Sequence, residues 1–151
     1  MLTLLIETVS KGGNLILNVG PTARGNFDYR ANEKLEAIGQ WMKYNSRSVY
    51  GCTEAPERFT APENSLMTYN TETNRLYIHL QEYPMQWYTL KGFGGKVKYA
   101  QFLHDGSEIQ FGEPRHNVTY QEVRAEEDVI LILPVVKPNV EIGRASCRER
   151  V

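Results

Sequence analysis

The chain has 151 residues, of which 41% are hydrophobic and 23% are charged, with 17 basic and 18 acidic side chains. This composition is typical of a soluble globular protein, and it excludes a chain that is disordered throughout. The length allows one domain or two small ones, but not a closed (β/α)₈ barrel, which needs about 250 residues. A net charge of −1 without a Lys- or Arg-rich run argues against nucleic acid or a membrane surface as a partner.

The first predicted element is a helix over residues 2–11. Its apolar side chains recur three and four positions apart, at Leu2, Leu5, Ile6 and Val9, and Gly12-Gly13 marks its end. No Ser, Thr, Asp or Asn precedes the helix as an N-cap. We therefore expect that the helix starts in the middle of an element and that the chain is truncated there.

A strand and a second helix are predicted next. The short apolar run Leu15–Val19 is typical of a strand that is covered on both faces, as in a parallel sheet, and Gly20-Pro21 ends it. Asp28 is the expected N-cap of a helix over residues 30–45. This helix, strand, helix order predicts a piece of an α/β layer, residues 1–51, followed by a Pro- and Gly-containing linker over residues 52–65.

Beyond the linker the apolar period changes from 3.6 to 2. Leu76, Ile78 and Leu80 alternate with polar or aromatic neighbours, so we expect a half-buried strand with His79 on its solvent side. Further strands are predicted at 66–69, 86–90, 96–103, 108–111, 118–122 and 129–133. Several short strands of this kind predict a small antiparallel β-sandwich.

Asn18, Gly20 and Pro21 are the first candidate site residues. They lie at the carboxyl end of the predicted strand, where parallel sheets and barrels place ligand contacts. The competing interpretation is that the Asn18 amide only satisfies backbone groups of the loop, which is the usual role of such an amide.

Tyr83, Trp87 and Tyr88 are a second candidate site. The three rings could form a sugar-stacking platform, or they could pack in the core and at the sheet edge, and packing is favoured because strands routinely bury aromatic residues. No other residues form a recognisable catalytic constellation. The three histidines have no nucleophile arranged with them, the adjacent pairs Glu54/Glu57 and Glu126/Glu127 are typical of solvated surface, and no metal or cofactor site is predicted.

One ordered set of motifs resembles a known family. The string from Leu5 to Pro21, LIETVSKGGNLILNVGP, is followed by LEAIGQW at residues 35–41 and by VYG at residues 49–51. This order resembles the α-L-fucosidases of glycoside hydrolase family 29, in which the segment is the last strand and helix of the catalytic barrel. LYIHL at residues 76–80, LKGF at 90–93 and residues 97–103 resemble the C-terminal β-sandwich of that family.

The resemblance implies a fold and an activity. The expected fold class is α+β, a helix-strand-helix remnant of a (β/α)₈ barrel followed by a small antiparallel β-sandwich over residues 66–141. Members of the family are retaining exo-hydrolases of terminal α-L-fucose that use an Asp nucleophile and a carboxylate acid/base, and no residue of this sequence falls at those positions. We therefore expect the catalytic pair upstream of Met1, no catalytic residue in this chain, and no fucosidase activity of this chain alone. A fucosylated glycan is the expected partner of the complete protein, without a cofactor, and its expected location is secreted, periplasmic or lysosomal, although residues 1–6 do not resemble a signal peptide.

The last ten residues depart from the family. Where a final apolar strand would follow Glu141, the chain reads IGRASCRERV, which resembles the conceptual translation of a DNA-sequencing adapter. We therefore expect residues 142–151 to be an artefact, and the sandwich to lack an edge strand. The rival hypothesis is a free-standing carbohydrate-binding or purely structural β-sandwich, for which the apolar segment before residue 51 would have no use.

Overall fold

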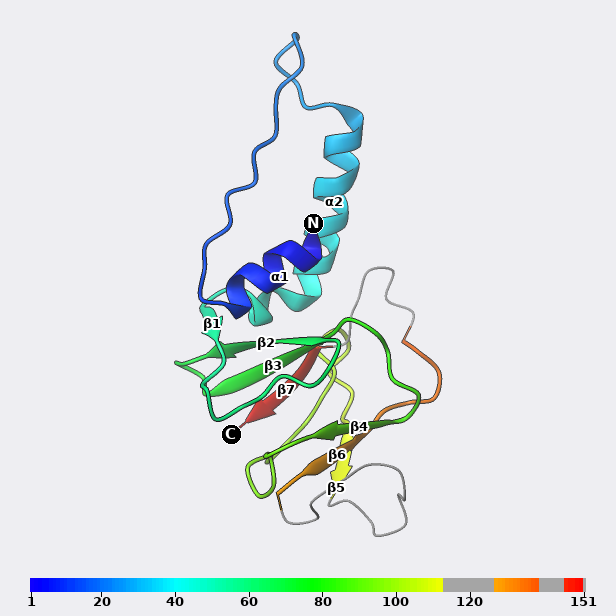
Figure 1. Cartoon of the computed structure of the whole chain (residues 1–151). Helices are drawn as coiled ribbons and strands as arrows, with labels where there is room; N and C mark the ends of the chain where they lie inside the picture. Colours follow the sequence, from blue (N-terminus) through cyan, green and yellow to red (C-terminus); the bar gives the residue numbers. More distant parts are fainter. Residues whose placement is uncertain (113–126, 139–145, 151) are drawn as a thin grey trace.

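The computed structural model describes residues 1–112 and 127–138, together with the backbone of residues 146–150. Two helices and a 3-10 turn lie on one side of two small antiparallel sheets (Figure 1). The fold is therefore α+β, as the sequence predicts. Within the described ranges, no helix is long and apolar enough to cross a membrane.

Helix α1, Leu2–Ser10, confirms the first predicted element and ends in a glycine cap. Gly12 adopts a φ of 69°, and its N–H donates to the Val9 carbonyl at 3.0 Å. The Gly13 N–H donates to the Thr8 carbonyl at 2.9 Å. These two bonds make a Schellman motif, in which the left-handed residue is usually Gly because a Cβ is costly there.

Residues 14–20 do not form the buried strand that the sequence predicts. They run as an extended segment without a paired neighbour in the described structure, and the Ile16 side chain is 89% exposed. The apolar pattern alone cannot make a strand, because a parallel strand needs backbone partners on its flanks. The segment then turns at residues 22–26, where Pro21 forms an isolated bridge with Phe27.

Helix α2, Tyr29–Asn45, begins at the predicted cap. The Asp28 carboxylate accepts the Arg30 N–H at 2.8 Å and so satisfies one of the free donors of the first turn. The helix continues into the 3-10 turn η1, Ser46–Ser48. Its buried Trp41 forms, with Ile6 of α1 and Val49, a small apolar cluster that joins the two helices.

The larger sheet has the strand order β1-β2-β3-β7, with all pairs antiparallel. Strand β1, Cys52–Glu54, lies inside the predicted linker and pairs with β2, Ser65–Asn70. Strand β3, Arg75–Leu80, forms a hairpin with β2, in which Met67 lies opposite Ile78. The second sheet has the order β4-β6-β5, with β4 at Trp87–Leu90, β5 at Gln110–Gly112 and β6 at Val129–Ile132.

The edge position beside β3 is occupied by the backbone of β7, Ser146–Arg150. The sequence predicts an open edge here, so this expectation is wrong for the described structure. Strand pairing uses backbone N–H and C=O groups that every residue except Pro carries, so the pairing of an edge strand depends little on its side chains. The pairing places Cys147 opposite Ile78.

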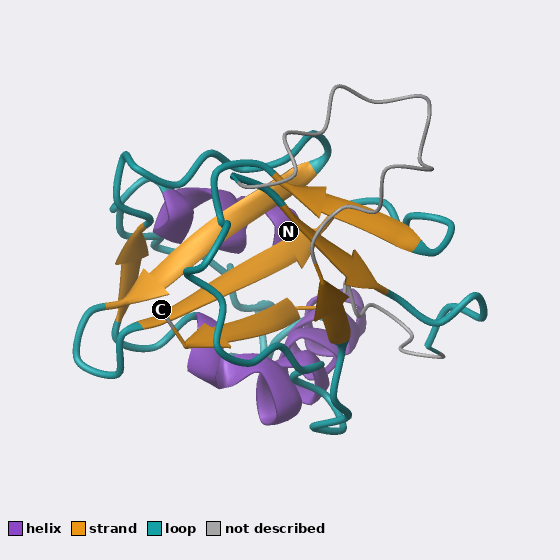
Figure 2. Ribbon diagram, turned by 90° about the horizontal axis from the view of Figure 1, so that it is seen from below, coloured by secondary structure: helices purple, strands orange, loops and turns teal. Residues whose placement is uncertain are grey.

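The main core lies between the two sheets, which Figure 1 shows one above the other and Figure 2 shows from below. Its buried members come from both sheets and from the loops around them: Phe59, Met67, Tyr69, Leu76, Ile78, Leu80, Leu90, Phe93, Ala100, Phe102, Ile109, Val129, Leu131 and Leu133. The predicted strand at 96–103 is mostly loop, in which Gln101 forms an isolated bridge with Glu108. The predicted strand at 118–122 lies outside the described residues.

Strand β3 differs from its prediction because both of its faces are covered. Leu76, Ile78 and Leu80 face the core between the sheets, while Tyr77 and His79 face the helices and are also buried. His79 is 1% exposed, so its predicted position on a solvent face is wrong. The alternating pattern correctly assigned the residues of β3 to its two faces, but it could not show that the helices cover the face of Tyr77 and His79.

Candidate functional site

The predicted substrate-side residues lie together on the extended segment before α2. Asn18, Gly20 and Pro21 are all exposed, so no other described element covers them. A Cβ added to Gly20 would meet no heavy atom within 4 Å, and nothing in the described chain therefore requires a glycine at this position. The three residues are therefore accessible to solvent in the described structure.

The three predicted stacking aromatics do not share one surface. Trp87 and Tyr88 are neighbours on β4, so their side chains point to opposite faces of the sheet. Trp87 is 54% exposed, whereas Tyr88 packs against the main core. Tyr83 also packs against this core, and its hydroxyl donates to the Pro134 carbonyl at 2.8 Å. Trp87 is thus the most open of the three rings.

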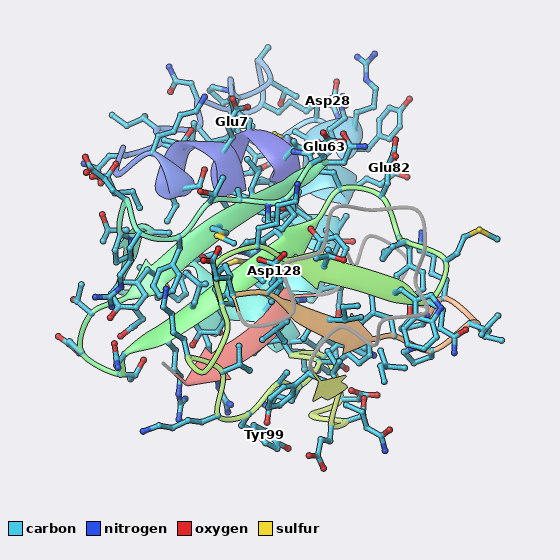
Figure 3. The ribbon with its side chains drawn as sticks, turned by 60° about the horizontal axis from the view of Figure 1, so that its bottom comes forward. Glu7, Asp28, Glu63, Glu82, Tyr99 and Asp128 are labelled. Atoms are coloured by element: carbon cyan, nitrogen blue, oxygen red, sulfur yellow. The ribbon has the colours of Figure 1, made fainter. Side chains whose placement is uncertain are left out.

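The carboxylates of the chain are dispersed over the fold (Figure 3). Glu7 lies on α1, Asp28 caps α2, Glu63 and Glu82 lie in loops, and Asp128 precedes β6. Asp128 is buried and accepts the Gly92 N–H at 2.9 Å, which holds the turn after β4. Glu54 and Glu57 are exposed, in agreement with a solvated surface. Across the described ranges, no three His, Cys, Asp or Glu side chains are grouped so that they could hold a metal ion.

A chain of buried polar groups joins α2 to the larger sheet, and no sequence pattern predicted it. The Asn45 amide donates to the Trp41 carbonyl at 3.0 Å, and the Ser48 hydroxyl donates to the Asn45 carbonyl at 2.8 Å. The Thr68 hydroxyl of β2 donates to the Ser48 carbonyl at 2.7 Å and lies 3.0 Å from Nε2 of His79. No local pattern marks these residues, because they become neighbours only when the helices pack on the sheet.

The hydrogen bonds of this chain fix the tautomer of His79. A hydroxyl has one proton, and Thr68 gives it to Ser48. His79 Nε2 must therefore carry the proton that Thr68 Oγ1 accepts, which leaves Nδ1 as an unprotonated acceptor. Burial lowers the pKa of His79 to about 3, so the ring is neutral at pH 7.

The other titratable groups offer no nucleophile. Burial raises the pKa of the Cys52 thiol to about 11, which keeps it protonated and unreactive at neutral pH. His104 lies 3.4 Å from the Asp105 carboxylate, near the surface, and His116 lies outside the described residues. The described groups therefore support packing and ligand contact, while they bring together no acid, base and nucleophile.

Comparisons with known proteins relate both parts of the chain to one group of enzymes. The profile of a family described as alpha-L-fucosidase matches residues 1–47. Human plasma alpha-L-fucosidase is 46% identical over 123 residues, which are 80% of this chain and 22% of that protein. The alpha-L-fucosidase of Dictyostelium discoideum is 37% identical over 146 residues, or 92% of this chain and 27% of that protein.

Structural comparison gives the same relationship. Alpha-L-fucosidase isoenzyme 1 from Paenibacillus thiaminolyticus matches with a TM-score of 0.81 and 30% identity, over 96% of this chain and 32% of that protein. The chain thus spans between about a fifth and a third of the length of these proteins. The similarity extends over most of this chain, which therefore resembles part of the α-L-fucosidases in both sequence and fold.

Proposed function

We propose that this chain is the C-terminal part of a retaining exo-α-L-fucosidase that acts on fucosylated glycans. In this proposal, residues 1–51 are the end of the catalytic barrel, residues 52–65 are the linker and residues 66–141 are the C-terminal β-sandwich. Residues 142–151 are derived from an adapter. The observation that carries the proposal is the 30% identity with a fucosidase over 96% of this chain at a TM-score of 0.81.

The extended segment 14–21 supports the barrel assignment. It has the apolar composition of a buried strand, yet Ile16 and Leu17 are exposed here. Apolar strands of α/β folds are covered on both faces and paired at both edges. Neighbouring barrel strands would supply that cover, and they would place Asn18, Gly20 and Pro21 at the carboxyl edge where barrel enzymes hold their ligands.

The chemistry of retaining glycosidases separates this chain from the complete enzyme. Such an enzyme needs two carboxyl groups about 5 to 5.5 Å apart across the glycosidic bond. No Asp or Glu of this chain stands at a motif position of the catalytic pair. We expect the purified chain to release no fucose from an aryl α-L-fucoside above a heat-killed control, and release above that control would contradict the proposal.

Long-read sequencing of the source DNA tests the origin of the chain directly. The proposal expects the reading frame to continue upstream into barrel strands with an Asp nucleophile, and other codons to replace those for residues 142–151. A stop codon upstream of Met1 together with a genomic tail would overturn it. In the complete enzyme, Asn18→Ala should lower fucosidase activity, and unchanged activity would return Asn18 to a loop-stabilising role.

The alternative, a carbohydrate-binding or purely structural sandwich, has Trp87 as its best residue because this ring is 54% exposed. Titration of the chain with a fucosylated oligosaccharide separates the possibilities. The fucosidase proposal expects no saturable binding by this part of the protein. Saturable binding that Trp87→Ala abolishes, while the equally exposed control Tyr44→Ala retains it, would favour the binding module.

A further inference from the structure

We propose that His79 and Trp41 form a proton-sensitive latch that holds α2 on the larger sheet, closed while His79 is neutral and opened when it takes up a proton. The two residues lie on different elements, since Trp41 belongs to α2 and His79 to β3. Their ring centroids are 6.4 Å apart and the ring planes are inclined by 34°. Both side chains are more than nine-tenths buried.

The two rings carry complementary polar atoms. Trp41 Nε1–H is a buried donor, and His79 Nδ1 is a buried acceptor, and neither has a hydrogen-bond partner within the described ranges. The two atoms are not hydrogen-bonded to each other, and a buried donor and a buried acceptor are each costly when unpaired. The neutral His79 tautomer with its proton on Nε2 is the form of the ring in which Nδ1 is an acceptor.

Protonation reverses this complementarity. An imidazolium donates from both nitrogens, so Nδ1–H would then be a second buried donor beside Trp41 Nε1–H. Nε2–H can keep its bond to Thr68, while the positive charge, which is delocalised over the imidazolium ring, would be buried where that ring lies near Trp41 of α2. Burial of a charge without a counter-ion is far more costly than burial of the neutral ring. Separation of α2 from the sheet relieves that cost, because it admits water to Nδ1.

Among the described residues, none around His79 supplies a compensating negative charge. On the helical side, Lys43 and Arg47 are exposed, and Glu7 of α1 is exposed in part and paired with Lys11 at 2.6 Å. Burial is accordingly the only cause of the lowered pKa of His79.

The described side chains of the sheet supply no negative charge either. Along β3, Tyr77 and Arg75 share the face of His79, while Tyr69 of β2 packs in the main core on the opposite face. Burial raises the pKa of Tyr77, and Cys52 beside it is also protonated at neutral pH. The chain position opposite His79 on β7 is Ser146, which does not titrate.

The direction of the pH dependence follows from these groups. The pKa of His79 is about 3 in the folded chain and 6.5 for an unburied imidazole, so the opened form takes up a proton first as the pH falls. The latch is closed above pH 6.5, and it weakens progressively between pH 6.5 and pH 3. For one linked proton, the opening equilibrium shifts up to tenfold per pH unit within that range.

The ring nitrogens can be observed directly in the unmodified chain. With ¹⁵N-labelled histidine, long-range ¹H–¹⁵N spectra at pH 7 should show one ring with a protonated Nε2 and a bare Nδ1, and this ring should remain neutral at pH 5. His79→Gln should remove that signal, whereas the matched control His104→Gln should keep it. A proton on Nδ1 at pH 7, or titration of His79 near pH 6.5 in the folded chain, would overturn the latch.

Hydrogen exchange locates the opening. After correction for intrinsic exchange, amides of α2 should exchange faster at pH 5 than at pH 7, with a much smaller change in β4 and β6. His79→Gln keeps an amide donor for Thr68 but cannot titrate, and it should abolish the effect, whereas His104→Gln should not. If His79→Gln fails to fold, Trp41→Phe serves instead, because it keeps the ring packing without the opposing N–H and should weaken the acid opening. Equal opening in wild type and in these variants would refute the proposal.

Discussion

The helical region and the sandwich bury their apolar side chains to very different extents. Fourteen buried side chains form the core between the two sheets, whereas Ile6, Trp41 and Val49 are the three fully buried members of the helical cluster. The core of the sandwich is enclosed by residues of the described chain. The helical region leaves Ile16, Leu17 and Phe27 exposed on the segment between its helices, so its apolar surface is only partly used. One continuous chain thus combines a β-sandwich with an enclosed core and a helical region that leaves apolar side chains exposed.

Removal of apolar volume from the sandwich should have the largest effect. Ile78 is fully buried at the centre of β3, and Ile78→Ala should lower the free energy of unfolding by about 2 to 5 kcal/mol because it leaves a cavity in a closed core. Urea unfolding followed by circular dichroism measures this. A loss below about 1 kcal/mol would mean that the core is loosely packed.

The same substitution in the helical cluster should act locally. Ile6 is as deeply buried as Ile78, but Ile6→Ala removes one of only three buried members, so we expect a loss of about 2 kcal/mol that is confined to the helices. Hydrogen exchange should then speed up in α1 and α2 and remain unchanged in β4 and β6. Ile16→Ala, at an exposed isoleucine, is the control and should change stability by less than about 0.5 kcal/mol. Equal effects of Ile6→Ala on both regions would remove the distinction between them.

Two glycine substitutions should have smaller effects of opposite sign. Gly12→Ala places a Cβ at a φ of 69° and should cost about 1 to 2 kcal/mol. Gly39→Ala lies inside α2 with no atom within 4 Å of the added Cβ, and it should stabilise the helix by about 1 kcal/mol. Thermal unfolding of both variants measures the two changes in stability. A stabilising Gly12→Ala would show that the Schellman cap of α1 does not form.

The helices and most strands were predictable because each depends on a short local pattern. The 3.6-residue period placed α1 and α2, the Asp28 cap set the start of α2, and alternation placed β2 and β3. Two features that depend on distant neighbours were not predictable. Leu15–Val19 has the composition of a strand but no partner to pair with in the described structure, and His79 has the spacing of a surface residue but lies under a helical layer.

Only part of the candidate site could be predicted from the sequence. Asn18, Gly20 and Pro21 lie side by side in the chain, so their common location follows from the sequence itself. Trp87 and Tyr88 lie side by side as well, yet the pleat separates them, and the degree of cover on each face decides which ring is open. The polar chain through Thr68 and Ser48 joins residues twenty positions apart, and only tertiary packing brings them into contact.

The position of β1 has a mechanical consequence. This strand starts only a few residues after η1 and forms three residue pairs with β2, the first of which joins Cys52 to Asn70. Only residues 49–51 separate the 3-10 turn from this strand. A torque on α2 would load the β1–β2 hydrogen bonds first, and slippage by one residue would turn every side chain of β1 to the opposite face. Through this short strand, the orientation of the helices is coupled to the register of the larger sheet.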